Sequence, residues 1–321
     1  MSRENPTKQT DGSTVSKRIV SVSLGSAKRD YERCATLLGQ EVKLERKGTN
    51  GSLKEAAALI RELDGKVDAI GLGGIDLYFH IGNRRYTLRD AARLAREAHV
   101  TPVVDGSGLK RSLERRVVNA LDGVVSWRGK CVLMVSALDR YAMASSLESL
   151  RAKVLYGDAI FGLGLPVPVY SSRTFRVAAR ALLPLVTELH IAWLYPTGSK
   201  QDVDERNSFS RFYTWADVIA GDWHLIRRYL PGRVDGKVFL TNTTTQENVD
   251  LLRRRGASKL ITTTPRFGGR SVATNVLEAA TVALAGKFPL SYAEYDALTA
   301  QMALRLEVQE LNAAKSHTDS A

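Results

Sequence analysis

Residues 238–245, VFLTNTTT, and residues 260–265, LITTTP, decide the fold predicted for this chain. In each stretch a short apolar run leads directly into a cluster of threonines, and a helical pattern follows. A buried strand that ends in polar residues before a helix is typical of the β/α units of a parallel sheet. Both clusters should therefore lie at the carboxyl ends of parallel strands, which is the edge where open α/β sheets bind ligands.

The second threonine cluster continues into a turn that contains two glycines and two arginines, residues 266–271. Glycines let the main chain approach a ligand closely, and guanidinium groups and helix-start amides attract anions. One threonine of the first cluster is also explained by helix capping alone, and the turn after the second cluster by a flexible connection with solvated arginines. We predict that an anionic cofactor, bound through phosphate or carboxylate groups, contacts these two segments at Asn242, Thr243, Thr244, Thr263, Thr264, Arg266, Gly268, Gly269, Arg270 and Ser271.

Strand-like and helix-like patterns alternate along most of the chain. A strand begins at Lys17, a hairpin is expected around Leu38 and Gly39, and Ser52 begins a capped helix. The alternation starts again near Gly129, which predicts an α/β protein with mainly parallel sheets in two Rossmann-like β/α domains. The expected parts are a disordered tail (1–16), an N-terminal β/α domain (17–128), a Rossmann-like domain with the ligand-binding turns (129–290), and a C-terminal helix over residues 292–311 with a polar tail (291–321).

Glycines and aspartates also follow the predicted strands of the first domain. Ordinary turns use the same residue types, so each turn alone is a weak indication of a site. Together they predict a second ligand-binding rim that faces the arginine-bearing turns across a cleft. We expect the substrate to contact Gly73, Gly74, Asp76, Asp105, Ser107 and Lys110.

Three residues of the second domain are candidates for proton transfer. Lys200 lies in a turn after an expected strand at residues 191–195, and Asp222 and His224 follow the strand that ends near Ala220. A desolvated lysine or a carboxylate beside an imidazole can exchange protons near neutral pH. The alternative explanations are a solvated surface lysine for Lys200 and a helix N-cap for Asp222.

Composition places the chain among globular proteins. Its 321 residues are 44% hydrophobic and 25% charged, which is enough for two ordinary cores, and its two cysteines lack metal-ligand spacing, so no metal is expected. The polar start and the absence of a long apolar run predict a cytoplasmic protein without a membrane partner. The net charge of +12 attracts anions in general, and it favours a small anionic metabolite over nucleic acid because no nucleic-acid motif accompanies it.

Several segments resemble a bacterial family whose members carry the label quinate or quinate/shikimate 5-dehydrogenase. The resemblance extends from about Lys17 to Gly286 and rests on residues 22–30, 69–76, 193–198, 241–245 and 262–271. It implies a two-domain enzyme that oxidises a ring hydroxyl of a cyclic hydroxy acid with NAD or NADP. The Ser-x-Thr-x-Pro segment and the Gly-Ala-Gly-Gly turn of shikimate dehydrogenases do not occur here, so the roles of their residues are not transferred.

Three functions are therefore compatible with the sequence. The first is an NAD(P)-dependent oxidoreductase of the quinate/shikimate type. The second is a transferase or isomerase that binds a nucleotide or a phosphorylated metabolite, and the third is a non-catalytic protein that binds an anionic metabolite. The sequence leaves open whether the chain forms a homo-oligomer.

Overall fold

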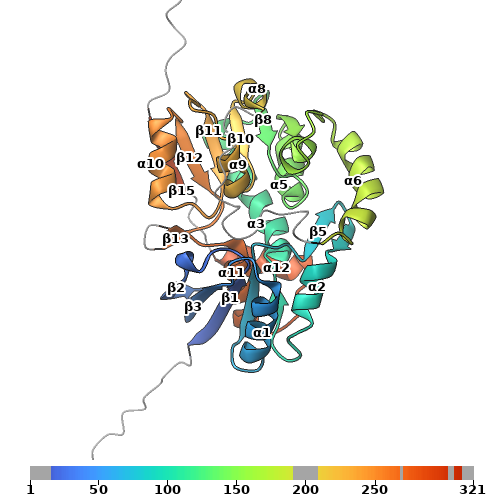
Figure 1. Cartoon of the computed structure of the whole chain (residues 1–321). Coiled ribbons are helices and arrows are strands. Elements are labelled where there is room, and N and C mark those ends of the chain that lie inside the picture. Colours follow the sequence, from blue (N-terminus) through green and yellow to red (C-terminus); the bar gives the residue numbers. More distant parts are fainter. Residues whose placement is uncertain (1–15, 191–208, 268–269, 303–306, 313–321) are drawn as a thin grey trace, which may run out of the picture.

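The computed structural model of the chain describes residues 16–190, 209–267, 270–302 and 307–312. The fold is α/β, with two mainly parallel sheets at the centres of two Rossmann-like domains (Figure 1), so the predicted fold class is confirmed. The strand expected at residues 191–195 lies outside the described residues, as do Lys200, Gly268 and Gly269. The side chains of Arg266 and Arg270 are also outside the description.

The first sheet has the strand order β2-β3-β1-β4-β7. Four strands run parallel, and β2 pairs antiparallel with β3. The predicted hairpin is confirmed, and Leu38 and Gly39 adopt the positive φ values, 50° and 74°, that a two-residue turn between twisted strands favours. The elements of this half are β1 (Lys17–Ser23), β2 (Tyr31–Leu37), β3 (Gln40–Gly48), α1 (Leu53–Leu63), β4 (Ala69–Gly73), β5 (Tyr78–Ile81), β6 (Arg84–Thr87), α2 (Arg89–Ala95) and β7 (Val103–Val104).

The second sheet has the order β15-β12-β11-β10-β8-β9, and all of its strands except β15 run parallel. Its strands are β8 (Cys131–Met134), β9 (Lys153–Tyr156), β10 (Val218–Ala220), β11 (Val238–Thr241), β12 (Lys259–Thr262) and β15 (Glu307–Glu310). Its helices include α5 (Tyr141–Ser149), α6 (Ser172–Val186), α8 (Ser210–Trp215), α9 (Trp223–Arg228) and α10 (Gln246–Arg254). Both threonine clusters end parallel strands, as their sequence pattern predicts.

The C-terminal region differs from the predicted long helix over residues 292–311. Helix α12 (Tyr292–Gln301) begins at a reciprocal cap between Ser291 and Glu294, and residues 307–310 form β15 instead of continuing the helix. Strand β15 pairs antiparallel with β12, so it covers what would otherwise be an exposed sheet edge. The prediction was wrong here because the pairing partner of residues 307–310 is distant in the sequence.

Two helices carry the chain between the domains. Helix α3 (Ser107–Ala120) leaves the first sheet after β7 and packs against α5 of the second domain. Helix α11 (Thr274–Ala285) returns from the second sheet and packs on β1 and β4 of the first, although the sequence assigns it to the second domain. Each domain is thus completed by a segment that comes from the other part of the chain.

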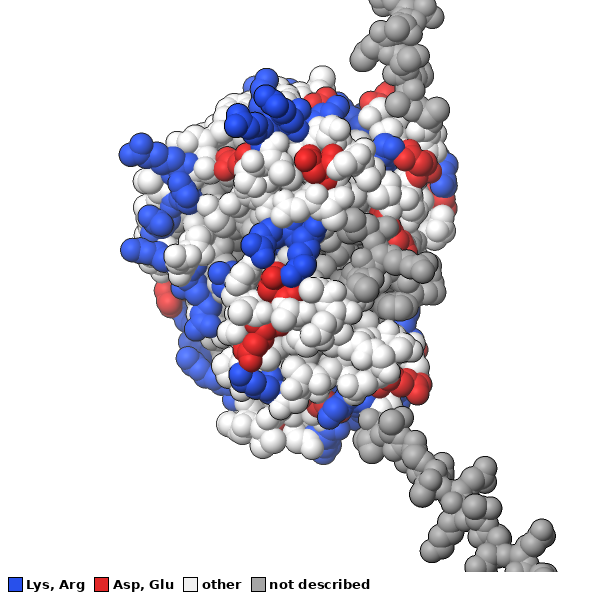
Figure 2. Space-filling model, turned by 180° about the vertical axis from the view of Figure 1, so that it is seen from behind, with Lys and Arg blue, Asp and Glu red and all other residues white. Residues whose placement is uncertain are grey.

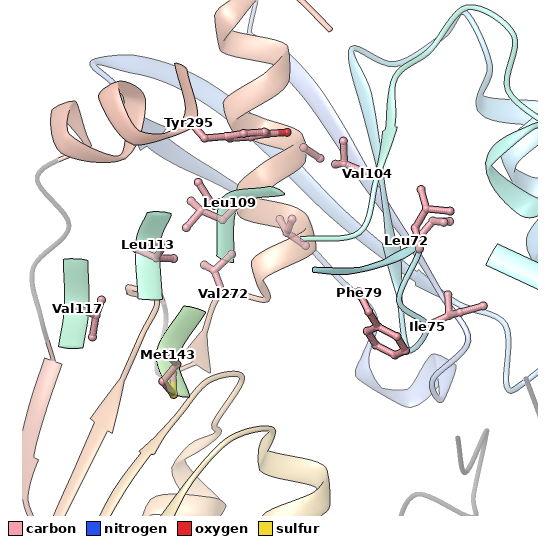
Figure 3. Close-up of a cluster of buried hydrophobic side chains, with 14 of the residues drawn as sticks. Leu72, Ile75, Phe79, Val104, Leu109, Leu113, Val117, Met143, Val272 and Tyr295 are labelled. Atoms are coloured by element: carbon pink, nitrogen blue, oxygen red, sulfur yellow. The ribbon is translucent and has the colours of Figure 1, made fainter. Parts of the chain in front are cut away.

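A hydrophobic cluster extends through both domains, and a second cluster lies within the second domain. Figure 3 shows a part of the first cluster, in which Leu109, Leu113 and Val117 of α3 lie with Met143 of α5 and Val272. Burial of such side chains is the main favourable term in folding. The two domains are therefore held together by packing as well as by the chain crossings.

Charge is spread over the surface rather than gathered on one element. Figure 2 shows basic side chains in several groups over one face of the molecule, with acidic side chains between them. None of the helices in the described part of the chain combines the length and the apolar character that crossing a bilayer requires.

Candidate functional site

The strand order places a ligand-binding edge in each domain. In the first sheet β1 has β3 on one side and β4 on the other, and in the second sheet β8 lies between β9 and β10. The chain therefore changes direction across the sheet at the pairs β1/β4 and β8/β10. Ligands of open α/β sheets bind beyond the carboxyl ends of the strands at such points.

A cavity of about 430 Å³ lies where these edges meet. Its size is within the range of small-molecule sites. From the first domain it is lined by residues that follow β1, β4 and β7, and from the second by residues that follow β8, β9, β10 and β11. The start of α11 and one side of α6 complete the lining. The cavity thus collects strand-end residues from both sheets.

Basic residues of the first domain line part of this cavity. The guanidinium of Arg29 lies 3.2 Å from Nε2 of His224, a contact that crosses from one domain to the other and requires an unprotonated Nε2. Arg46 donates to the carboxylate of Asp30 at 2.6 Å and to Oγ of Ser23 at 2.9 Å. These cations give the cavity an environment that attracts an anion.

A buried ionic cluster forms another part of the lining. Nζ of Lys110 lies 3.2 Å from Oδ1 of Asp76 and 3.3 Å from Oδ2 of Asp139. Burial opposes the charge on Lys110, but the two carboxylates outweigh it and raise its pKa, so this lysine stays an ammonium and is no base. Burial raises the pKa of Asp139. Arg140 holds Glu114 beside this cluster in a fully buried ion pair.

One oxygen of Asp139 has no partner among the described residues. Its Oδ2 meets Lys110, whereas Oδ1 is inaccessible to solvent and accepts no hydrogen bond there. Asn242, at the end of β11, is similar: its amide nitrogen lies 3.5 Å from Oγ1 of Thr274, and its Oδ1 is buried without a described partner. Both residues line the cavity. A buried acceptor without a donor is costly, which makes these two atoms the natural partners of ligand donors.

In several turns, carboxylates of the protein itself accept the hydrogen bonds of main-chain amides that could otherwise bind an anionic ligand. Asp158 accepts from the amides of Ala137 and Leu138, at 3.1 and 2.9 Å, in the turn after β8. Burial raises the pKa of Asp158 to about 7, against the lowering effect of these amides. In the first domain Asp105 accepts from the amides of Leu77 and Tyr78 at 2.6 and 3.1 Å.

Asp222 acts as the N-cap of α9. Its Oδ1 accepts from the amide of His224 at 2.9 Å and from that of Leu225 at 3.4 Å, which is the alternative role that its position allows. Burial alone would raise the pKa of Asp222, but His224 and Arg140 hold it below its usual value. At neutral pH Asp222 is thus an anion that orients the segment bearing His224.

Helix α11 begins at the cavity without a side-chain cap. Its N-cap residue is Ala273, and Thr274, Asn275 and Val276 of its first turn line the cavity. The free donors of a first turn and the positive end of the helix dipole favour an anion. This helix start lies next to Asn242 at the end of β11, because the amide nitrogen of Asn242 contacts Thr274 and its Oδ1 is the buried acceptor described above.

The structure brings together many of the residues predicted from the sequence. The predicted residues that line the cavity are Gly73, Gly74, Asp76, Asp105, Lys110, Asp222, His224, Asn242, Thr243 and Ser271. Ser107 instead donates to Asp105 at 2.6 Å, and Oγ1 of Thr264 donates to the carbonyl of Val272 at 2.6 Å.

The two threonine clusters do not share the cavity. Thr243 lines it, whereas Thr244, Thr263 and Thr264 are buried outside the lining. The amide of Thr244 donates to Oγ of Ser271 at 2.6 Å, so this part of the cluster fixes the chain rather than meeting a ligand. The remaining predicted residues lie outside the described part of the structure, so their predicted roles are not tested: Lys200, Gly268, Gly269 and the side chains of Arg266 and Arg270.

The sequence predictions missed several lining residues. Asp158 follows β9, so the rule that polar residues after parallel strands form sites points to it. Arg46 lies inside β3, where its position gives no indication of a ligand site. The apolar residues of α6 form an ordinary amphipathic pattern, which indicates a buried helix face and not a ligand site. In the described part of the chain, no group of His, Cys, Asp and Glu side chains is arranged to hold a metal ion.

Two family models match the chain. The model described as domain of unknown function (DUF8753) matches residues 18–105, and the model described as domain of unknown function (DUF8754) matches residues 108–311. The second match covers more than half of the 321 residues, and the chain belongs to the DUF8754 family. No curated protein sequence matches it.

The solved structures that match the chain include an enzyme and solute-binding proteins. Hetero-hexameric glutamate dehydrogenase from Thermus thermophilus is 15% identical, with a TM-score of 0.44, over 90% of this chain and 73% of that one. An ABC transporter solute-binding protein from Agrobacterium vitis with bound allitol is 12% identical, with a TM-score of 0.36, over 86% and 91% of the two chains. A sugar ABC transport substrate-binding protein from Bordetella parapertussis is 13% identical, with a TM-score of 0.35, over 84% and 80%.

Proposed function

We propose that this member of the DUF8754 family is an enzyme that binds a small hydroxylated anion, such as a cyclic hydroxy acid, between its two domains. The observation that carries the proposal is that Asp139 and Asn242, each with a buried oxygen that has no described partner, both line a cavity that also contains cations. Ligand hydroxyls would donate to the two acceptors. The carboxylate or phosphate of the ligand would bind near Arg29, Arg46 and the start of α11.

Asp139 is the residue best placed to accept a proton from a ligand hydroxyl. Asp139 lines the cavity and has one buried oxygen without a described partner, and burial raises its pKa, which makes its carboxylate a stronger base. Lys110 remains protonated beside it and stabilises its charged form. His224 is the second candidate, because it lines the cavity at the contact between the domains and its imidazole can donate or accept a proton.

An NAD(P)-linked oxidoreductase of the quinate/shikimate type is the second candidate function. The parallel strands of the second sheet follow the doubly wound order 2-1-3-4-5, and Asp158 follows β9, where dinucleotide-binding domains keep the carboxylate that binds a ribose. However, residues 135–140, VSALDR, contain no glycine, and Asp158 occupies the amides of Ala137 and Leu138. The turn after β8 therefore does not fit the pyrophosphate of a dinucleotide.

Calorimetric titration of the full-length chain tests the leading proposal. Quinate or shikimate should bind, and Asn242→Leu should weaken the binding about tenfold, because a buried hydrogen bond to the ligand is lost and 1.4 kcal/mol corresponds to a factor of ten. Gln246→Leu, on the exposed face of α10 in the same region, is the matched control and should bind as the parent does. Equal affinity of the parent and Asn242→Leu would place the ligand elsewhere.

Further measurements separate the other functions. A change of absorbance at the nicotinamide band when quinate or shikimate is added with NAD or NADP would support the oxidoreductase. Stabilisation by nucleotides or phosphates, but not by dinucleotides, would favour a transferase or isomerase. Binding of a hydroxy acid with no product in mass spectra would support a non-catalytic binding protein.

A further inference from the structure

We infer that the ligand of the interdomain cavity carries an aromatic ring beside its anionic group, because α6 gives the cavity a continuous apolar wall. The inference rests on the proposed function and names the substrate class more narrowly. A fully hydroxylated, saturated ring would fit the charged part of the cavity but not this wall.

The wall is formed by two neighbouring rows of α6. Phe175, Ala179 and Leu183 follow one another at intervals of four residues and are only 6%, 6% and 2% exposed. The second row has the same spacing, and every residue that α6 contributes to the lining is apolar: Phe175, Ala178, Ala179, Leu182, Leu183 and Val186. Helix α6 contributes no charged residue to the lining, and the charged groups of the cavity belong to other elements and to the turns that follow the strands.

Contacts at both ends hold α6 in place. At its start Phe175 stacks on Tyr156 with ring centroids 4.4 Å apart and on Tyr141 with ring centroids 6.2 Å apart. At its end the carbonyl of Thr187 accepts from the amide of Arg89 at 2.9 Å, in the first domain. The helix therefore bridges the two domains along one side of the molecule (Figure 1), and its apolar face is a fixed part of the site.

Aromatic side chains extend the apolar part of the cavity. Tyr31 and Phe79 of the first domain and Tyr156 of the second line it together with Phe175 of α6. Rings pack favourably in offset or edge-to-face contact with other rings, beyond the effect of the area buried. Ligand hydroxyls against such a surface would lose their water without gaining partners, which opposes binding of a polyol there. An aromatic acid with few hydroxyls satisfies both parts of the cavity.

The test compares two ring acids on the full-length chain. The compound 3,4-dihydroxybenzoate has an apolar, planar ring with two hydroxyls, whereas quinate has a saturated ring with several hydroxyls, and each carries one carboxylate. We expect 3,4-dihydroxybenzoate to bind at least about tenfold more tightly than quinate in calorimetric titration, because its ring buries apolar area against α6. Leu182→Asn should reduce the affinity for 3,4-dihydroxybenzoate about threefold to tenfold.

Leu185→Asn is the matched control for the wall. Leu182 and Leu185 are both exposed leucines of α6, at 52% and 71%, but only Leu182 lines the cavity, so both variants should fold and only Leu182→Asn should lose affinity. Tighter or equal binding of quinate would overturn the inference and leave the proposed function standing. Equal loss in the two variants would also overturn it, and binding of neither acid would contradict both proposals.

Discussion

Several buried carboxyl groups form no ion pair within the described part of the chain. Asp158 and Asp105 accept from main-chain amides, and Glu278 of α11 accepts from the hydroxyl of Tyr295 at 2.6 Å. The second oxygen of Glu278 has no partner among the described residues. Burial, together with the neighbouring Asp105, raises the pKa of Glu278 to about 8. At neutral pH the folded protein thus holds a proton on Glu278 that the unfolded chain would release.

This proton makes stability depend on pH in a direction that can be tested. Between the ordinary pKa of 4.5 and the folded value of about 8, the folded state binds more protons than the unfolded state, so the free energy of unfolding falls as pH rises. Glu278 alone contributes a slope of about 1.4 kcal/mol per pH unit within this range. Glu278→Gln keeps the acceptor for Tyr295 but cannot titrate. Urea denaturation at a series of pH values should give a flatter curve for Glu278→Gln, and parallel curves would contradict the assignment.

At the scale of elements, the docking of α11 explains why glycine stands at two positions of the first domain, residues 71 and 106. A Cβ on Gly71 in β4 would lie 2.7 Å from the carbonyl oxygen of Asn275, and one on Gly106 would lie 2.9 Å from the amide nitrogen of the same residue. Gly106 also has a φ of 98°, which side chains rarely allow. Both glycines let the start of α11 approach the first sheet closely. That approach places Asn275 and the uncapped first turn at the cavity.

Gly71→Ala should therefore loosen the contact between α11 and the first sheet. We expect the free energy of unfolding to fall by about 1–3 kcal/mol, as for other overpacked sites, because neither main-chain segment can move freely. Gly123→Ala is the control, since a Cβ there would meet nothing within 4 Å. Denaturant unfolding of both variants measures the difference. Unchanged stability of Gly71→Ala would mean that α11 can shift without cost.

At the scale of the whole molecule, the first domain depends on chain that follows the second. Helix α11 covers β1 and β4, and α12 packs on α3, so the core around residues up to 106 is completed by segments that follow the second domain. Val276, Ala279 and Ala280 of α11 are buried in the core shared by both domains. The domains are thus separate sheets within one cooperative structure.

A fragment of residues 16–106 should consequently fail to fold alone. Without α11 the apolar face of β1 and β4 would be exposed to water, and a small domain has little stability in reserve. We expect weak near-ultraviolet circular dichroism and no cooperative denaturation. The same fragment joined by a flexible linker to residues 270–302 should regain a cooperative transition. Cooperative folding of the fragment alone would show that the first sheet needs no cover from α11.

Much of the architecture was predictable from local sequence. The hairpin at Leu38 and Gly39, the cap at Ser52 and the threonine-ended strands each depend on residues within a few positions of one another. Strand-end placement also indicated Asp76, Lys110, Asp222 and Asn242, which line the cavity. The sequence by itself therefore determined the alternation of elements, the fold class and one set of cavity residues, because period, caps and turns are short-range properties of the chain.

Only the tertiary structure decided how those parts are used. Pairing of β15 with β12, the return of α11 to the first sheet and the bridge made by α6 join residues far apart in the chain. The same contacts place the carboxylate of Asp158 on the amides of Ala137 and Leu138 and leave the acceptors of Asp139 and Asn242 without described partners. No local pattern records such contacts, since they depend on the packing of both sheets around one shared core.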